Sequence, residues 1–252
     1  MTRSIGAVCV ALLGFSLNGP ARAADVKDAK AILDKAIKAM GGEEKLSQAM
    51  KGASWKYKGT ISFGGNDNPF TGQTIIHGLN HIRQEFEGEF GGNQIKGVTI
   101  VAGDKGWRKI GDEKTDLEKD AVANEKQRAY LALIPVTIVP LQGKHFKVEA
   151  IDEENVSGKA AAGIKGTGPD GKEFRLYFDK QTGLPVRIVA KVVGFMGEDY
   201  TQDTTFSDYK EIDGIKKAMK SESKRDGEKF INANLTEFRI LNRVDPKKFA
   251  EP

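Results

Sequence analysis

The chain of 252 residues contains a single cysteine and three histidines, and this scarcity excludes several kinds of site. The cysteine, Cys9, lies in an N-terminal apolar segment, so the rest of the chain has no thiol for a disulfide or a thiolate metal site. The sequence also has no run of 18 apolar residues, and we therefore expect no transmembrane segment in the mature chain.

An excess of one charge sign is also missing, because 39 basic residues face 35 acidic residues and the formal net charge is +4. Nucleic-acid binding through phosphate neutralisation needs a larger excess or a local basic cluster, so we expect no nucleic-acid partner. Glycine, in contrast, is abundant, with 29 residues. That share is well above the usual value of about 7%.

The first 23 residues have the pattern of a secretory signal peptide. Arg3 precedes an apolar run, Ile5–Leu17, which is followed by Gly19-Pro20 and the small-x-small sequence Ala21-Arg22-Ala23. The run is too short to span a membrane, and the small residues are typical of a cleavage site. We predict cleavage after Ala23 and an exported, periplasmic protein in which residues 24–252 form one domain.

The mature chain is predicted to begin with helix and to continue as strands. Apolar residues recur at three- and four-residue steps over Asp25–Met40, Gly41-Gly42 suits a helix end, and Glu43–Met50 predicts a second short helix. From Trp55 onward the period becomes two, and turn sequences separate ten to twelve strands. Gly64–Pro69 is expected to be a loop by its composition.

One helical segment interrupts the strands between Asp116 and about Leu141. The helix is predicted to run until Pro135, where proline interrupts the hydrogen-bond ladder. Residues 131–141 are the most apolar stretch of the mature chain, and their prolines make them unsuited to a central strand.

Several motifs suggest chemistry but fit ordinary turns better. Gly166–Glu173 matches both G-x-G-x-x-G and G-x-x-x-x-G-K, yet a phosphate loop needs a following helix and Lys172–Asp179 alternates like a strand. We therefore predict a hairpin turn there. Asp152-Glu153-Glu154 is predicted to be a solvated turn, because adjacent carboxylates point apart and do not form a catalytic pair.

His77 and His81 have the H-x-x-x-H spacing of metal ligands, but a turn sequence separates them. Across a hairpin the two imidazoles could face each other, although His145 is the one other histidine. We predict no metal, no cofactor and no catalytic residue, and therefore not an enzyme. A hydrolase remains a third hypothesis, which an acidic or histidine cluster in a cleft would support.

The predicted sheet must bury its apolar face against another layer. We predict a mainly β (α+β) fold, a strongly curved antiparallel sheet or incomplete β-barrel plugged by the N-terminal and mid-chain helices. Either the helices fill the interior, or they leave an apolar cavity suited to acyl chains. The candidate lining residues are Trp55, Phe63, Phe86, Trp107, Tyr130, Leu131, Leu133, Ile134, Val136, Ile138, Phe178 and Phe195.

The order of these parts resembles the LolA/LolB-like family of bacterial outer-membrane lipoprotein-sorting carriers. Three segments carry most of the resemblance: Leu176–Arg187 (LYFDKQTGLPVR), Phe206–Lys216 (FSDYKEIDGIK) and Asn242–Phe249 (NRVDPKKF). The resemblance implies an incomplete barrel whose hydrophobic cavity shields the acyl chains of a lipoprotein, with an envelope membrane protein as a further partner. It also implies an arginine that holds the empty, closed state, for which Arg128 is the candidate.

Our preferred hypothesis is a non-enzymatic periplasmic carrier or sensor of a lipid-like ligand. On this hypothesis, Leu133→Asp is expected to weaken ligand binding more than stability. The alternative is an exported structural or interaction module that docks a protein partner through a sheet edge or through residues 131–141.

Overall fold

The structure, a computed structural model, describes residues 24–194 and 197–252, with side chains from residue 28 onward. The predicted signal peptide, residues 1–23, and Phe195 lie outside the described residues. The helices are α1 (Ala24–Met40), α2 (Glu43–Lys51) and α3 (Lys119–Thr137), with short 3₁₀ turns η1 (Val139–Gln142) and η2 (Pro246–Phe249).

The strands form one antiparallel sheet of thirteen strands within the described ranges. They are β1 (Ala53–Phe63), β2 (Asn66–His77), β3 (His81–Phe90), β4 (Asn93–Ala102), β5 (Lys105–Ile110), β6 (Glu113–Asp116), β7 (Lys147–Val156), β8 (Lys159–Thr167), β9 (Glu173–Asp179), β10 (Pro185–Val193), β11 (Asp199–Ile212), β12 (Ile215–Arg225) and β13 (Glu228–Ile240).

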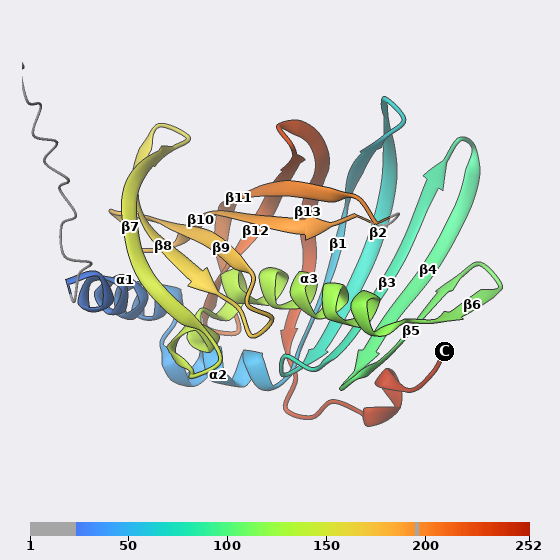
Figure 1. The fold of residues 1–252 in the computed structure, drawn as a ribbon, viewed down its shortest axis with the longest axis horizontal. Helices are drawn as coiled ribbons and strands as arrows, with labels where there is room; N and C mark the ends of the chain where they lie inside the picture. Colours follow the sequence, from blue (N-terminus) through green and yellow to red (C-terminus); the bar gives the residue numbers. More distant parts are fainter. Residues whose placement is uncertain (1–23, 195–196) are drawn as a thin grey trace, which may run out of the picture.

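The sheet order is β6-β5-β4-β3-β2-β1-β13-β12-β11-β10-β9-β8-β7. The chain therefore starts at the centre of the sheet, runs outward through hairpins to β6, crosses along α3 to the far edge at β7, and returns to pair β13 with β1. Figure 1 shows the sheet bending around α3. The edge strands β6 and β7 do not pair, so the predicted incomplete barrel is confirmed.

Period-two alternation predicted ten to twelve strands, and the strand that lies outside all of the predicted runs is β6. This strand consists of Glu113-Lys114-Thr115-Asp116, which has no apolar alternation and is held by its pairing with β5. The expected loop at Gly64–Pro69 was wrong beyond Gly65, because β2 begins at Asn66. The Asn68 amide donates to the carbonyls of Ile61 (3.3 Å) and Phe63 (3.4 Å), which lets polar residues extend this hairpin.

Two further expectations needed correction. Helix α3 continues past Pro135 to Thr137 and ends where Ile138 adopts a φ of 57°, with the Ile138 amide donating to Ile134 O at 2.8 Å. A proline near a helix end removes one hydrogen bond there and leaves the preceding turns intact. Asp152-Glu153-Glu154 lies within β7 at a register shift, and not in a turn, since Tyr177 and Arg187 both donate to Glu154 (2.6 and 2.5 Å).

All three helices pack on the concave face of the sheet and form one core with it. The outer face carries a smaller cluster in which Ile75, Ile100 and Phe249 of η2 are buried. None of the helices in the described ranges is long and apolar enough to cross a membrane.

Candidate ligand-binding face

Eight of the predicted lining residues lie in the packed core between the helices and the sheet, each at most 9% exposed. They are Trp55, Tyr130, Leu131, Leu133, Ile134, Val136, Ile138 and Phe178. Leu133 itself is 1% exposed, so Leu133→Asp would bury a charge in this core. Contrary to the sequence-based expectation, we now expect its main effect on stability.

Polar contacts on one side of α3 fix it to strand β10. The Gln127 amide donates to the carbonyl of Lys191 at 2.8 Å, and the Arg128 guanidinium donates to the carbonyl of Val193. Arg128, the predicted closing residue, also pairs with Glu125 at 2.7 Å. These bonds to strand carbonyls hold the helix in place over this part of the sheet.

Contacts on its other sides complete the attachment of α3. Glu125 is 6% exposed and accepts a second charged bond from Arg108 of β5 at 2.6 Å. In the β8–β9 turn, Asp170 accepts from the Tyr130 hydroxyl (2.9 Å), and the Lys172 ammonium donates to Gln127 (3.0 Å). Helix α3 is therefore bonded to both halves of the sheet, to β5 in one half and to β10 and the β8–β9 turn in the other.

The same β8–β9 turn contains the phosphate-loop motif, and the predicted hairpin is confirmed there. The amide of Gly168 donates to Lys172 O at 2.9 Å, and the amide of Gly171 donates to Gly168 O at 3.0 Å. These two amides close the turn and do not point toward a ligand.

Phe63 and Phe86 belong to a different region, which we call the aromatic floor: Tyr57, Phe63, Phe70, Phe86 and Phe90. These side chains lie on the concave face of β1, β2 and β3, as the strand register shows. Their ring centroids are 5.8–6.3 Å apart in the pairs Tyr57–Phe70, Phe70–Phe86, Phe86–Phe90 and Phe63–Phe90. Figure 1 shows that the hairpin ends of β1–β2 and β3–β4 extend past α3, which leaves this face without a helix over it.

Glycines alternate with the rings of the aromatic floor in neighbouring strands. Gly72 stands in register with both Tyr57 and Phe86, and Gly88 stands opposite Phe70. A Cβ atom at Gly72 would lie 2.4 Å from the Tyr57 ring, and one at Gly88 would lie 2.8 Å from the Phe86 ring. The rings of Tyr57, Phe86 and Phe90 therefore lie over these glycines, and the floor they form is apolar.

The aromatic floor and the neighbouring strand β5 carry the most exposed large apolar side chains among the described residues. Among the described residues, the large hydrophobic side chains classed as exposed are Phe63 (66%) and Ile110 (39%). Ile110 of β5 lies in register with Gly97, which lies in register with Phe86, so Ile110 is on the same face. Tyr57, Phe86 and Phe90 are part-buried, and Phe70 is buried at the centre.

Trp107, in contrast, does not share this face. It pairs with Ile100 and packs on the outer face with Phe249, because Gly106, Arg108 and Ile110 occupy the inward positions of β5. Alternation predicts two faces for a strand but does not say which one is buried against the helices. Tyr57, Phe90 and Ile110 were missed for the same reason, although the alternation of Tyr57 with Gly59 and of Phe90 with Gly88 is visible in the sequence.

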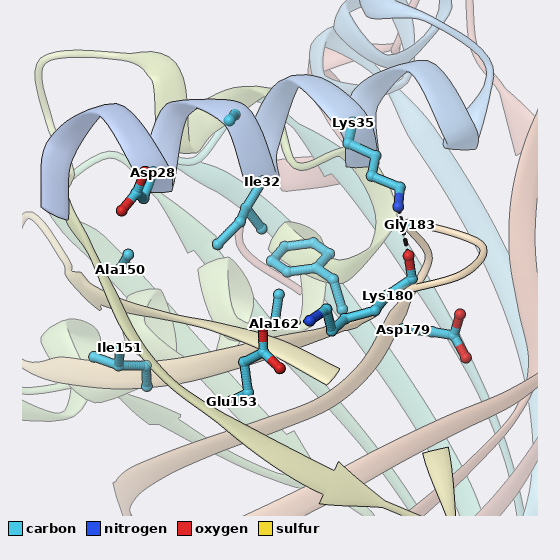
Figure 2. A pocket seen from close by; sticks show the side chains of 12 residues that line it. Asp28, Ile32, Lys35, Ala150, Ile151, Glu153, Ala162, Asp179, Lys180 and Gly183 are labelled. Carbon is cyan, nitrogen blue, oxygen red and sulfur yellow. Dashed lines mark hydrogen bonds and ion pairs between the residues drawn. The ribbon is translucent and has the colours of Figure 1, made fainter. Parts of the chain in front are cut away.

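A separate pocket of about 460 Å³ lies between α1 and the strands β7–β9. Figure 2 shows Ile32 of α1 pointing across it toward Ala162 and Ala150 of the strands. Charged groups close its rim, since Lys35 donates to the carbonyl of Lys180 and the Lys180 ammonium pairs with Glu153, both at 2.5 Å. Of the predicted lining residues, this pocket contains Phe178.

His77 and His81 face each other in register across the β2–β3 hairpin, with ring centroids 5.8 Å apart. His81 also contacts the Phe249 ring at 5.5 Å. Within the described ranges, no group of three or more histidine or acidic side chains is placed to hold a metal ion.

The architecture is that of an open antiparallel half-barrel with helices on its concave face, and solved structures identify it as the LolA-like fold. An outer membrane lipoprotein-sorting protein domain, so described, from Vibrio parahaemolyticus matches with a TM-score of 0.56 at 9% identity, covering 89% of this chain and 97% of that one. A LolA superfamily protein from Nitrosomonas europaea matches with a TM-score of 0.57 at 10% identity, covering 88% and 97%.

A DUF1329 family protein from Desulfovibrio piger also shares the fold, with a TM-score of 0.54 at 16% identity over 88% of this chain and 97% of that one. No family model and no curated protein matches the sequence. At these identities the likeness establishes the fold of the chain.

Proposed function

We propose that this protein is an exported, non-enzymatic carrier of a hydrophobic ligand, a lipid or the acyl chains of a lipoprotein, which lie on the aromatic floor. The observation that carries the proposal is the exposure of Phe63 (66%) and Ile110 (39%) at the margins of a continuous apolar face. Exposed apolar patches of this kind mark sites of interaction.

The shape of the floor favours an acyl chain over a bulky group. Rings that lie over Gly72 and Gly88 form an apolar surface along the strands, with which a flexible chain can make contact over its length. Each buried methylene contributes about 0.8 kcal/mol, so a chain of ordinary length gains several kcal/mol from apolar transfer alone.

Similar solved structures support the same conclusion, since one of them is described as an outer membrane lipoprotein-sorting domain. The N-terminal sequence supports export, which would place the protein where such a ligand must cross an aqueous compartment. The proposal includes a membrane protein of the cell envelope as the partner that loads or receives the ligand.

The alternative, docking of a protein partner, has less support. Residues 131–141 form the last turns of α3 and continue into η1, and they are mostly buried, so they do not present an apolar surface. One sheet edge, β6, is four residues long and fully exposed with three charged side chains, a device that discourages strand pairing. At the other edge, β7 packs against α1.

The test uses lipid-stripped protein and the uncharged fluorescent probe N-phenyl-1-naphthylamine. Phe63→Glu combined with Ile110→Glu places two charges on the floor at positions that are already exposed, so folding should survive. We expect the probe affinity to fall by at least about tenfold, since each charge must lose solvation to admit an apolar ligand. The matched control is Lys109→Glu, the neighbour of Ile110 on the outer face.

Native mass spectrometry of the protein as isolated provides a second measurement, in which we expect lipid adducts that the double variant lacks. If the wild-type protein takes up neither probe nor lipid, or if the double variant binds as well as the Lys109→Glu control, the proposed function is wrong.

A further inference from the structure

Lys217 is a cation on the concave face of the sheet that has no acidic partner among the residues the structure describes. Lys217 is part-buried on β12, and its ammonium lies 5.8 Å from the centroid of the Trp55 ring and 5.8 Å from that of Phe238. Both rings are buried in the core formed with the helices. The ammonium therefore points inward over two aromatic rings and not outward into solvent.

In the part of the chain that the structure describes, the strands around Lys217 supply no anion for it. Within the described residues Lys217 has no ion pair and no hydrogen bond, and its register partner on β11 is another lysine, Lys210. Glu237 of β13 is engaged with Lys56 (2.9 Å) and Arg239 (2.6 Å). Burial lowers the pKa of Lys217 to about 7, which is the expected response of an amine whose charge is not compensated.

Lys217 also lies at one end of the aromatic floor. Trp55, which it contacts, and Tyr57, the first ring of the floor, are two residues apart on the same face of β1. From Trp55 to Phe63 the strand advances eight residues, which is about 26 Å. That span is comparable to an extended long-chain fatty acid.

We propose that Lys217 binds the carboxylate of a long-chain fatty acid whose hydrocarbon chain extends along the aromatic floor toward Phe63. This inference rests on the proposed function and names its ligand class, an anionic single-chain amphiphile. The carboxylate of the fatty acid forms an ion pair with the Lys217 ammonium, and burial of the hydrocarbon chain on the aromatic floor contributes the apolar part of the binding free energy.

The test compares oleic acid with methyl oleate, which has the same chain and no charge, as competitors of N-phenyl-1-naphthylamine at about pH 6. This pH lies below the pKa of about 7 of Lys217, so most of the amine is protonated. We expect the wild-type protein to bind oleate about tenfold more tightly than the ester, the size of one charge-assisted hydrogen bond. In Lys217→Met the preference should disappear while the affinity for methyl oleate is retained.

The control variant is Lys216→Met, which removes an exposed lysine one residue away on the opposite face and should keep the full preference. Equal binding of acid and ester by the wild-type protein, or a preference that survives in Lys217→Met, overturns the role of Lys217. Because the comparison in the wild-type protein needs no variant, it stands even if Lys217→Met folds poorly. If neither oleate nor methyl oleate displaces the probe, the proposed function fails together with this inference.

Discussion

The concave face of the sheet has two parts, one covered by helices and one open, and their side chains differ in burial. Strand β1 passes through both: Trp55 is buried beneath the helices, whereas Phe63 at the far end of the strand is 66% exposed. In the covered part, apolar side chains interlock with α1, α2 and α3. In the open part, rings lie over glycines of the sheet, and the hairpin ends extend past α3 (Figure 1).

The difference follows from the reach of the covering helices. Helix α3 has 19 residues, about 28 Å of helix, and its polar contacts fix it across one end of the strands. The hairpin ends beyond it must therefore be stable without a helix. Aromatic rings packed on one another and on the sheet provide that stability and leave an apolar surface open to a ligand.

The largest expected effect contrasts the two parts directly. Leu133→Ala in the covered part removes a side chain that is 1% exposed and should lower the free energy of unfolding by roughly 2–5 kcal/mol. Phe63→Ala, in the open part, should cost well under half as much and instead weaken binding of the probe. Urea titration of both variants measures this, and equal losses would show that the two parts are packed alike.

Lys217, at the boundary between the two parts, should make the stability of the protein depend on pH. Its folded pKa is about 7 and its ordinary value is 10.5, so between these values the unfolded chain holds more protons than the folded one. The free energy of unfolding should therefore rise with pH across this window, by roughly 2–4 kcal/mol in all. Urea titrations should show that rise for wild type and Lys216→Met but not for Lys217→Met, which should be the more stable variant at pH 7.

Substitutions at glycine test how the aromatic rings of the open part pack on the sheet. A Cβ at Gly88 would lie 2.8 Å from the Phe86 ring and 2.9 Å from the Phe90 ring, so Gly88→Ala should lift both rings. We expect a loss of roughly 1–3 kcal/mol in stability and weaker probe binding. In the matched variant, Gly97→Ala, the Cβ meets nothing closer than 3.5 Å. Comparable losses in the two variants would contradict the role given to Gly88.

The smallest effect concerns the attachment of α3. Tyr130→Phe deletes the hydrogen bond to Asp170 (2.9 Å) and keeps the ring in the core. Stability should fall by about 1 kcal/mol, the net worth of one such bond. Because Tyr130 lies in the covered part, affinity for the probe should not change, and a clear change would link this helix to ligand binding. Thermal unfolding and probe titration are sufficient measurements.

Much of the architecture could be predicted from local patterns. The alternation from Trp55 onward and the turn sequences between runs predicted ten to twelve strands, and the spacing of apolar residues predicted α1. Strand β6 could not be predicted in this way, because its four polar residues form a strand through their pairing with β5. The end of α3 was placed two residues early, since the proline rule describes a helix interior and not its last turn.

The candidate site was predicted less well, for a reason of register. Phe63 and Phe86 were named correctly as inward residues, but Trp107 has the opposite parity on its strand and lies on the outer face. Lys217 was missed because nothing in its sequence neighbourhood, which is rich in lysine, distinguishes it from Lys216. Only the register of β12 in the sheet gives one of them the inward position.

The sequence by itself determined the periodicities, the turns and the choice of sheet and helix, because these depend on residues close together in the chain. The tertiary structure alone decided which side of each strand faces inward and how far the helices extend over it, since both depend on pairing between distant segments. The open aromatic floor, and the position of Lys217 at its end, therefore depend on the tertiary structure.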